Sequence, residues 1–363
     1  MRIALVAPPW FAVPPAGYGG IERVVHYLAE GLVELGHEVT LFAAGGSKTS
    51  GRLVETFEHP PSPLLGDPLI EAEHLMEVFA RWREFDIIHD HTRLGSLIAP
   101  AVDIPVVHTI HGPLVPEFQR YYERAHKHGV SFICISEHQR STLPEGISAT
   151  VIWNAIDLRQ WPFGEKPGDY LLFVGRMNPD KGILPAMEIA RRAGRRLVIC
   201  AKINEAEERE YFERHVRPEL QKVEHELYFQ PPPEKIRELY AGARATLFPI
   251  CWPEPFGLVM IESMATGTPV IAFRNGSVPE VIDDGVTGRI CETIEEAVEA
   301  EKTIDQIDRT ACRQRVRELF SAPVAVRKHE ALYRRLLGFA DGFLTVPQTL
   351  ARVESQAGER LQR

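Results

Sequence analysis

Residues 170–182 read YLLFVGRMNPDKG, an apolar run that ends in a loop with glycine and proline. An unbroken apolar run is typical of a parallel strand that is covered on both faces. A helix is expected next at about 184–193, followed by a second strand at 197–201. This order of strand, loop, helix and strand is how a doubly wound α/β domain begins.

The same order is found at the start of the chain. There we expect a strand at 3–7, a loop rich in proline and glycine at 8–20, a helix at about 21–35 and a strand at 39–43. Because 363 residues are too many for one ordinary core, the two beginnings predict two domains. Ligands bind such open sheets outside the carboxyl ends of the strands. We therefore expect an α/β fold in which two Rossmann-like, doubly wound domains face each other across a cleft that holds the site.

The domain boundaries are predicted from local composition. Residues 161–168 (WPFGEKPG) contain two prolines and two glycines and read as a linker between a first domain at 1–160 and a second at 169–322. An amphipathic helix at 323–340 follows, and then a tail at 341–363 that is a poor candidate for the core. Further strands are expected at 87–89, 106–110, 132–135, 151–153, 226–229, 245–248, 270–272 and 288–290.

The composition excludes several classes of protein. The formal net charge is −9, whereas a nucleic-acid partner calls for a basic surface. No run approaches about 18 apolar residues, and residues 1–6 already read as a strand rather than a signal peptide. The five cysteines lack the Cys-x-x-Cys spacing of zinc sites and are expected to be buried free thiols. We expect a cytoplasmic protein without a transmembrane segment; peripheral membrane contact and the oligomeric state stay open.

Two carboxylates with seven residues between them occur in residues 253–262, which read PEPFGLVMIE. The prolines prevent a helix at the start of this stretch, and a helix is expected at 257–266. Glu254 then lies at the mouth of a helix whose free N–H groups can hold an anion, and Glu262 lies about two turns further on. A capping carboxylate and an ordinary helical glutamate would also explain the pair.

Two cations flank the loop of the opening sequence. Arg176 and Lys181 can clasp a diphosphate as it leaves with negative charge, although a pair of solvated surface cations is the alternative. A second loop at 17–22 (GYGGIE), with Tyr18, Gly19 and Gly20, can bring backbone N–H groups close to a ligand because glycine has no Cβ.

Polar residues also follow the expected strands of the first domain. His111 lies in the run HTIHG at 108–112 and can hydrogen-bond a sugar hydroxyl while staying neutral, whereas His108 reads as a buried core histidine. The run DIIHDH at 86–91 resembles a metal cluster, but neighbouring strand residues point to opposite faces, so no metal site is predicted. Ser136 and Asn154 sit at strand ends that face the cleft, where capping and turn roles are the simpler explanation.

Together these motifs resemble the family 4 glycosyltransferases, which are retaining, depend on nucleotide sugars and have the two-domain GT-B fold. Those enzymes carry two glutamates separated by seven residues with Phe-Gly-Leu between them, followed by a Gly-x-Pro-Val turn, here residues 267–270. Their arginine and lysine are separated by four residues, and their site histidine lies in a His-x-x-His-Gly context. The match extends over most of the chain, and it implies that the helix at 323–340 crosses back to the first domain.

The resemblance also implies roles for individual residues. Catalytic roles fall to His111, near the reacting sugar, and Glu254, which holds hydroxyls of the donor sugar. Glu262 would bind the ribose, and Arg176 and Lys181 the diphosphate. The other implied donor contacts come from Gly19, Gly20, Phe256, Gly257 and Leu258, and the implied acceptor side comprises Tyr18, Ser136 and Asn154.

The implied reaction moves a hexosyl group from a nucleoside diphosphate sugar to a hydroxyl acceptor with retention, the leaving phosphate taking the acceptor's proton. A UDP-sugar is favoured over a GDP-sugar as the donor. The nucleotide sugar is a substrate, so no cofactor is expected. No metal is expected either. The acceptor would be a small molecule, a glycan or a lipid-linked compound. Two alternatives stay open: a nucleotide-sugar 2-epimerase on the same fold, and a non-catalytic protein that binds sugar nucleotides or glycans.

Overall fold

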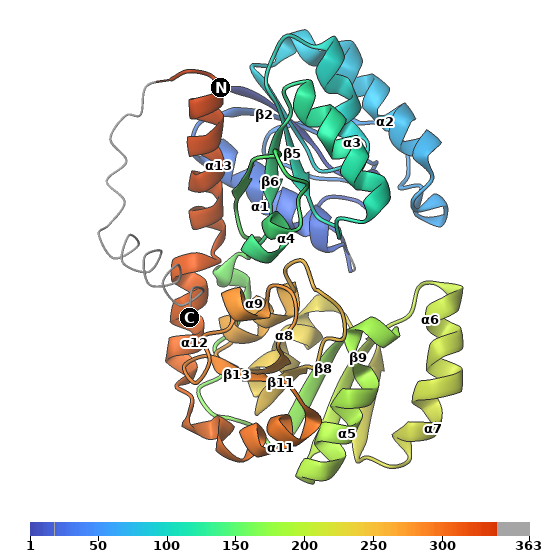
Figure 1. Ribbon diagram of the computed structural model, residues 1–363, viewed down its shortest axis with the longest axis vertical. Helices are drawn as coiled ribbons and strands as arrows, with labels where there is room; N and C mark the ends of the chain where they lie inside the picture. The colour runs from blue at the N-terminus through green and yellow to red at the C-terminus, as the bar shows by residue number, and fades with distance from the viewer. Residues whose placement is uncertain (18, 340–363) are drawn as a thin grey trace.

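The computed structural model describes residues 1–17 and 19–339. Each half of the chain forms one parallel sheet flanked by helices, and the two halves lie one above the other in Figure 1. The predicted pair of doubly wound α/β domains is thus confirmed. The tail predicted at 341–363 and Tyr18 lie outside the described residues.

The first sheet has seven strands in the order β3-β2-β1-β4-β5-β6-β7, all parallel to their neighbours. Its strands are β1 (Arg2–Val6), β2 (Glu38–Ala43), β3 (Arg52–Glu55), β4 (Ile87–Asp90), β5 (Val106–Ile110), β6 (Ser131–Cys134) and β7 (Ala149–Val151). The helices of this domain are α1 (Gly20–Glu34), α2 (Pro68–Arg81), α3 (Pro116–Lys127) and α4 (Glu137–Ser141).

The second sheet has six parallel strands in the order β10-β9-β8-β11-β12-β13. Its strands are β8 (Tyr170–Arg176), β9 (Arg196–Lys202), β10 (His225–Phe229), β11 (Ala245–Phe248), β12 (Val270–Phe273) and β13 (Gly288–Cys291). The helices are α5 (Ile183–Ala193), α6 (Ala206–Tyr211), α7 (Arg217–Leu220), α8 (Pro233–Gly242), α9 (Leu258–Ala265), α10 (Val278–Val281), α11 (Ile294–Thr303) and α12 (Arg309–Leu319).

Alternation along β1 shows why the first sheet is covered on both faces. Ile3 and Leu5 belong to the apolar cluster shared with α1, while Ala4 and Val6 belong to the cluster on the opposite face with α2 and α3. Successive strand residues point to opposite faces, so a wholly apolar strand needs helices on both sides. This arrangement leaves the carboxyl ends of the strands for polar residues.

The last described helix, α13 (Ala322–Leu336), leaves the second domain and packs against α1 of the first (Figure 1). It buries Val326 and Tyr333 there, and the Tyr333 hydroxyl lies 2.5 Å from His89 Nδ1. The two helices approach closely because Gly31 of α1 has no side chain: a Cβ there would lie 2.5 Å from Val326 Cγ2. The core of the first domain is therefore completed by the end of the chain.

Four expectations from the sequence need correction. The edge strand β3 was not predicted, because RLVE has charged ends and only half-buried apolar residues. The strand expected at 151–153 is β7 at 149–151, where Cys134 of β6 pairs with Val151. Strand β8 continues to Arg176, which pairs with Lys202 of β9, so Arg176 ends a strand rather than following one. Cys251, expected to be buried, is exposed because β11 ends before it, at Phe248.

Within the described residues, no helix has both the length and the apolar character needed to cross a membrane.

We expect Gly31→Ala to lower the free energy of unfolding by about 1–3 kcal/mol, because the added methyl group would overpack the contact with Val326. The direction of this change in the free energy of unfolding is informative, since alanine in a helix interior ordinarily stabilises a protein by about 1 kcal/mol relative to glycine. The measurement is urea denaturation of the wild type, both single variants and the double variant with Val326→Ala. If Gly31→Ala costs as much in the Val326→Ala background, the proposed clash is not the cause.

Candidate active site

The loop after β8 presents two cations at the carboxyl end of the second sheet. Arg176 is the last residue of β8, and Lys181 ends a short 3₁₀ turn (Pro179–Lys181). The Lys181 N–H donates to Asn178 Oδ1 at 3.2 Å. Gly182 has a φ of 74°, and a Cβ there would lie 1.9 Å from the Pro249 carbonyl oxygen. Glycine at this position therefore lets the loop fold tightly between β8 and α5.

Both cations are paired with carboxylates. Arg176 bonds through Nε to Glu208 and through Nη2 to Glu205 at 3.3 Å. Burial by itself would raise the pKa of Glu208, but the N–H groups of Asn204 and Glu205 and the Arg176 guanidinium hold it below its ordinary value. Glu208 is thus a charged anchor that orients the guanidinium.

Lys181 and Glu254 form the contact that joins the two motifs of the second domain. Lys181 Nζ lies 2.5 Å from Glu254 Oε2, which also accepts a hydrogen bond of 2.8 Å from Trp252 Nε1. Glu254 is held in its loop because Ser277 N–H bonds to its carbonyl oxygen at 3.0 Å. The cation expected at a diphosphate and the carboxylate expected at a sugar are therefore direct neighbours.

The chain reverses between Glu254 and α9. Gly257 has a φ of 78°, a backbone conformation that glycine adopts without strain, and α9 begins at Leu258. Phe256 is buried, with its ring 5.9 Å from that of Phe320, so its side chain belongs to the core. The first N–H groups of α9 have no partner within the helix, which fits the implied backbone contacts of these three residues.

Glu262, one of the two carboxylates of the motif, reaches the other domain. Its Oε1 lies 3.3 Å from Arg23 Nη1 of α1, and its Oε2 accepts a hydrogen bond of 3.2 Å from the Tyr240 hydroxyl. Burial raises the pKa of Glu262, and the Arg23 guanidinium opposes that rise. No local pattern marks Arg23 or Tyr240 as a partner of Glu262, since they lie on the separate helices α1 and α8.

The glycine loop of the first domain meets α9 here. Gly19 is the N-cap of α1 with a φ of 141°, and a Cβ on Gly20 would lie 3.2 Å from Leu258 Cδ1. The beginnings of α1 and α9 therefore face each other across the domain interface. Gly19 and Gly20 thus lie close to the donor side predicted from the sequence.

A second contact between the domains involves Glu280 of α10. Its carboxylate accepts hydrogen bonds from the backbone N–H groups of Glu137 and His138, at 2.7 and 2.6 Å, where α4 begins. It also accepts one of 3.2 Å from Trp153 Nε1. Sequence analysis missed Glu280, because nothing in its local pattern distinguishes it from a surface glutamate.

His111 is paired with a histidine that the sequence analysis had considered only as a metal ligand. His91 Nδ1 lies 2.9 Å from His111 Nε2, and the two rings stack with centroids 5.2 Å apart. His108 instead bonds to the buried carboxylate of Asp90 at 2.6 Å, which agrees with its reading as a core histidine. Within the described residues no group of three or more side chains is placed to hold a metal ion.

The hydrogen bond between the two histidines fixes their tautomers. His91 Nε2 is buried without a hydrogen-bond partner in the described part of the chain, and a buried N–H in that state is rarer than an unpaired acceptor. His91 therefore carries its proton on Nδ1 and donates to His111 Nε2. Burial and the imidazoles of His108 and His329 lower the pKa of His111 to about 3, so His111 is neutral with its proton on Nδ1.

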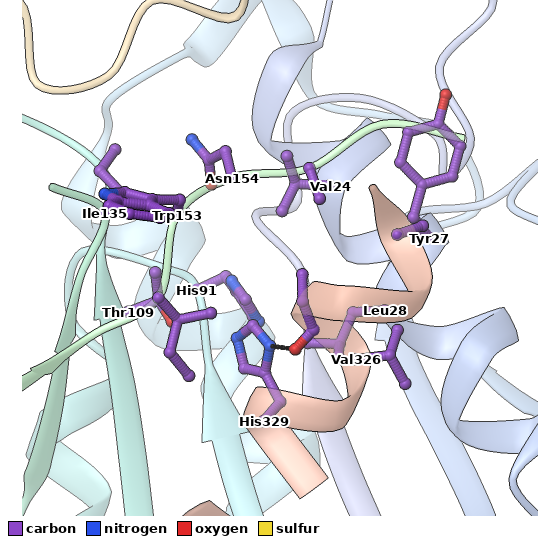
Figure 2. Close-up of a pocket in the computed structure, with 14 residues that line it drawn as sticks. Val24, Tyr27, Leu28, His91, Thr109, Ile135, Trp153, Asn154, Val326 and His329 are labelled. Atoms are coloured by element: carbon purple, nitrogen blue, oxygen red, sulfur yellow. Dashed lines mark hydrogen bonds between the residues drawn. The ribbon is translucent and has the colours of Figure 1, made fainter. Parts of the chain in front are cut away.

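The remaining candidates adjoin the Glu280 contact, since Ser136 precedes Glu137 and Asn154 follows Trp153. Ser136 Oγ caps α4 by accepting the Gln139 N–H at 3.0 Å, so capping accounts for it. Asn154 is buried and lines a void of about 20 Å³ together with His91, Trp153 and His329. Figure 2 shows Asn154 beside Trp153, with His91 and His329 on the other side of the void. Asn154 therefore shares a void with His91, the partner of His111.

A cavity of about 430 Å³ opens at the carboxyl ends of β1, β4 and β5. His111 and Gly20 line it, and so do Glu22 of α1 and residues of α3. The structure thus brings together His111, Gly20 and this cavity in the first domain, and Arg176, Lys181, Glu254 and Glu262 in the second. The beginnings of α1 and α9 join the two sets.

Sequence profiles of two protein families match the chain, one in each domain. Glycosyltransferase Family 4 matches residues 18–160, and Glycosyl transferases group 1 matches residues 157–317. A glycogen synthase of Mycobacterium tuberculosis is 26% identical over 87% of this chain and 88% of its own length. A phosphatidyl-myo-inositol mannosyltransferase of Mycolicibacterium smegmatis is 28% identical over 80% of each chain.

The crystal structure of a glycosyltransferase involved in avilamycin A biosynthesis is also similar. It is 26% identical, covers 93% of this chain and 98% of its own, and superimposes with a TM-score of 0.70.

We expect nitrogen NMR of the histidine side chains to show His111 with a bare Nε2, a protonated Nδ1 and no titration between pH 5 and 8. The reason is the donated bond from His91 and the pKa of His111 near 3. His91→Phe should let the His111 ring populate both tautomers, whereas His91→Asn keeps an N–H donor near the position of Nδ1 and should preserve the wild-type form. The exposed His59→Phe serves as control. A protonated His111 Nε2 in the wild type would contradict the assignment.

Proposed function

The chain belongs to glycosyltransferase family 4 and has the GT-B fold, and we propose that it is a cytoplasmic, metal-independent hexosyltransferase. In the proposed reaction a hexosyl group moves from a nucleoside diphosphate sugar, UDP-sugar rather than GDP-sugar, to a hydroxyl of the acceptor with retention at the anomeric carbon. The observation that carries this proposal is the 2.5 Å contact between Lys181 and Glu254 at the mouth of α9.

The second domain is proposed to bind the donor. Its diphosphate would lie at Arg176 and Lys181, where the charge that develops on the leaving group is met by fixed cations. The carboxylates that hold both cations in place orient them without a diphosphate, so little reorganisation is needed when one binds. Glu254 would then exchange part of its bond to Lys181 for hydroxyls of the donor sugar.

Glu262 is proposed to bind the ribose of the donor. In the structure its two oxygens are occupied by Arg23 and Tyr240, so the ribose would compete with Arg23 for Oε1. The backbone N–H groups of residues 256–258, which lie where α9 begins, would contact the phosphates. Each of these roles follows the family's motif residue by residue.

The acceptor is proposed to enter the cavity of the first domain beside His111. Its hydroxyl oxygen forms a bond to the anomeric carbon, the bond between that carbon and the diphosphate oxygen breaks, and the hydroxyl proton passes to the leaving diphosphate. The neutral His111 can donate Nδ1–H to an oxygen of the reacting sugar. No protein nucleophile takes part in this scheme.

The test of this function is a donor screen with UDP- and GDP-hexoses, a mixture of hydroxyl acceptors and EDTA in the buffer. We expect release of nucleoside diphosphate, a new glycoside in the mass spectrum and the donor's anomeric configuration in its proton NMR spectrum. An inverted product would overturn retention, and activity that needs added magnesium or manganese would overturn metal independence. Conversion of the donor into its 2-epimer without a new glycoside would favour the epimerase.

The two glutamates of the motif should separate kinetically. We expect Glu254→Gln to lower kcat on the order of 10- to 100-fold, because contacts to the reacting sugar strengthen in the transition state. Glu262→Gln should mainly raise KM for the donor, because contacts to the ribose stay similar throughout the reaction. The measurement is kcat and KM for the donor in both variants and in the exposed control Glu299→Gln. The opposite pattern would exchange the two roles.

A further inference from the structure

The cavity beside His111 has a mainly aromatic wall. Its volume of about 430 Å³ lies within the range of about 300–1,000 Å³ that is usual for small-molecule sites. The rings of Phe118 and Tyr122 on α3 stack with centroids 5.8 Å apart and an interplanar angle of 25°. Leu65 and Val115 line the same cavity and are 50% and 37% exposed, although both are apolar. The wall is completed by two residues of the loop after β1, Trp10 and Phe11.

Most polar groups of the cavity floor already have partners. The Thr109 hydroxyl bonds to His89 at 2.7 Å, and His108 bonds to Asp90. Thr92 Oγ1 accepts the Gly95 N–H at 3.0 Å. A sugar ring presents several hydroxyls, and each one that is buried without a partner costs free energy. These three side chains are therefore already engaged, which leaves fewer side chains on the floor for the hydroxyls of a sugar ring.

The charges of the lining do not favour an anion. Glu22 and Glu71 both line the cavity, and burial raises the pKa of each carboxyl group, of Glu22 to about 7. Among the described lining residues Arg93 carries the one permanent positive charge, and its guanidinium lies 5.0 Å from the Phe118 ring centre. Burial also keeps the His91 and His111 rings neutral by lowering the pKa of each. A phosphate group here would meet a single guanidinium, which already lies over the Phe118 ring.

We propose that the acceptor is an uncharged alcohol whose reacting hydroxyl is attached to a flat, mainly apolar ring system, such as a phenol or a fused-ring alcohol. This inference rests on the proposed hexosyl transfer and names its acceptor. The rings lie against the aromatic wall, and the hydroxyl points to the floor near His111. Transfer joins the hydroxyl oxygen to the anomeric carbon, and the hydroxyl proton leaves on the diphosphate. Sugar phosphates and soluble glucans are excluded as preferred acceptors.

The test compares acceptors on the full chain with the donor found in the screen. We expect kcat/KM for 2-naphthol to exceed that for 6-hydroxy-2-naphthoic acid, its matched anion, at least tenfold. It should also exceed the values for glucose, glucose 6-phosphate and maltotetraose at least tenfold. Product mass and nucleoside diphosphate release are both recorded. A tenfold preference for glucose 6-phosphate, maltotetraose or the naphthoate would overturn the acceptor class and leave the transferase function standing.

A binding measurement keeps the inference testable if no donor is turned over. We expect saturable binding of 2-naphthol to the protein by isothermal titration calorimetry, weakened at least tenfold by Phe118→Ala and to a smaller extent by the milder Phe118→Leu, which keeps apolar volume without the ring. The control is Phe79→Ala, an exposed phenylalanine on α2 of the same domain that does not line the cavity. Absence of saturable binding, or equal affinity in the Phe118 and Phe79 variants, would overturn the proposal. Binding without turnover would contradict the transferase function alone.

Discussion

Carboxylates of the second domain that bond to the first domain set the geometry of the whole site. Glu262 reaches the Arg23 guanidinium, and Glu280 accepts two backbone N–H groups where α4 begins. Both contacts involve a charged acceptor in a partly dry interface, where such hydrogen bonds are stronger than in water. They bring the start of α1 against the start of α9, so that the proposed donor residues and the acceptor cavity share one interface.

The charges at this interface are balanced locally in a protein with an acidic net charge. Each cation proposed to meet the diphosphate already has a carboxylate partner. Arg176 pairs with Glu208 of α6, and Lys181 pairs with Glu254 in the loop before α9. Lys202 of β9 lies near Arg176 and Glu22, and burial lowers its pKa to about 7. In the proposed donor site, an arriving diphosphate would therefore replace carboxylates at cations that are already oriented, so its binding would depend on shape as well as charge.

The sequence predicted the parts of this molecule that depend on local pattern. Apolar runs such as 106–110 and 245–248 form strands with the predicted bounds. Such strands can be recognised in the sequence because a strand that is covered on both faces consists almost entirely of apolar residues. The edge strand β3 was missed because an edge needs no such run. Glu254 and Lys181 were recognised separately, yet their 2.5 Å contact depends on how two loops 73 residues apart meet.

The partners of the site residues could not be predicted for the same reason. Arg23 and Glu262 are separated by 239 residues, and no local pattern marks either one for the other. His91 and His111 meet because β4 and β5 are neighbours in register, with Asp90 beside His108, and this becomes visible only once the strand order is known. Alternation of the side chains argues against a shared metal for the run at 86–91, and this stays a prediction. Alternation alone did not reveal the hydrogen bonds that these residues form.

The return of α13 to the first domain matters for exchanging domains between related chains. A recombinant that took residues 1–156 from this protein and the remainder from a relative would place a foreign helix over β1 and α1. That helix would need a residue that fits the bare backbone at Gly31 and a hydroxyl for His89, as Val326 and Tyr333 provide here. A modular exchange therefore has two crossover points, one at the linker and one near Ser321, where the chain bridges back to Ile156. Structural modules and contiguous sequence segments do not coincide in this chain.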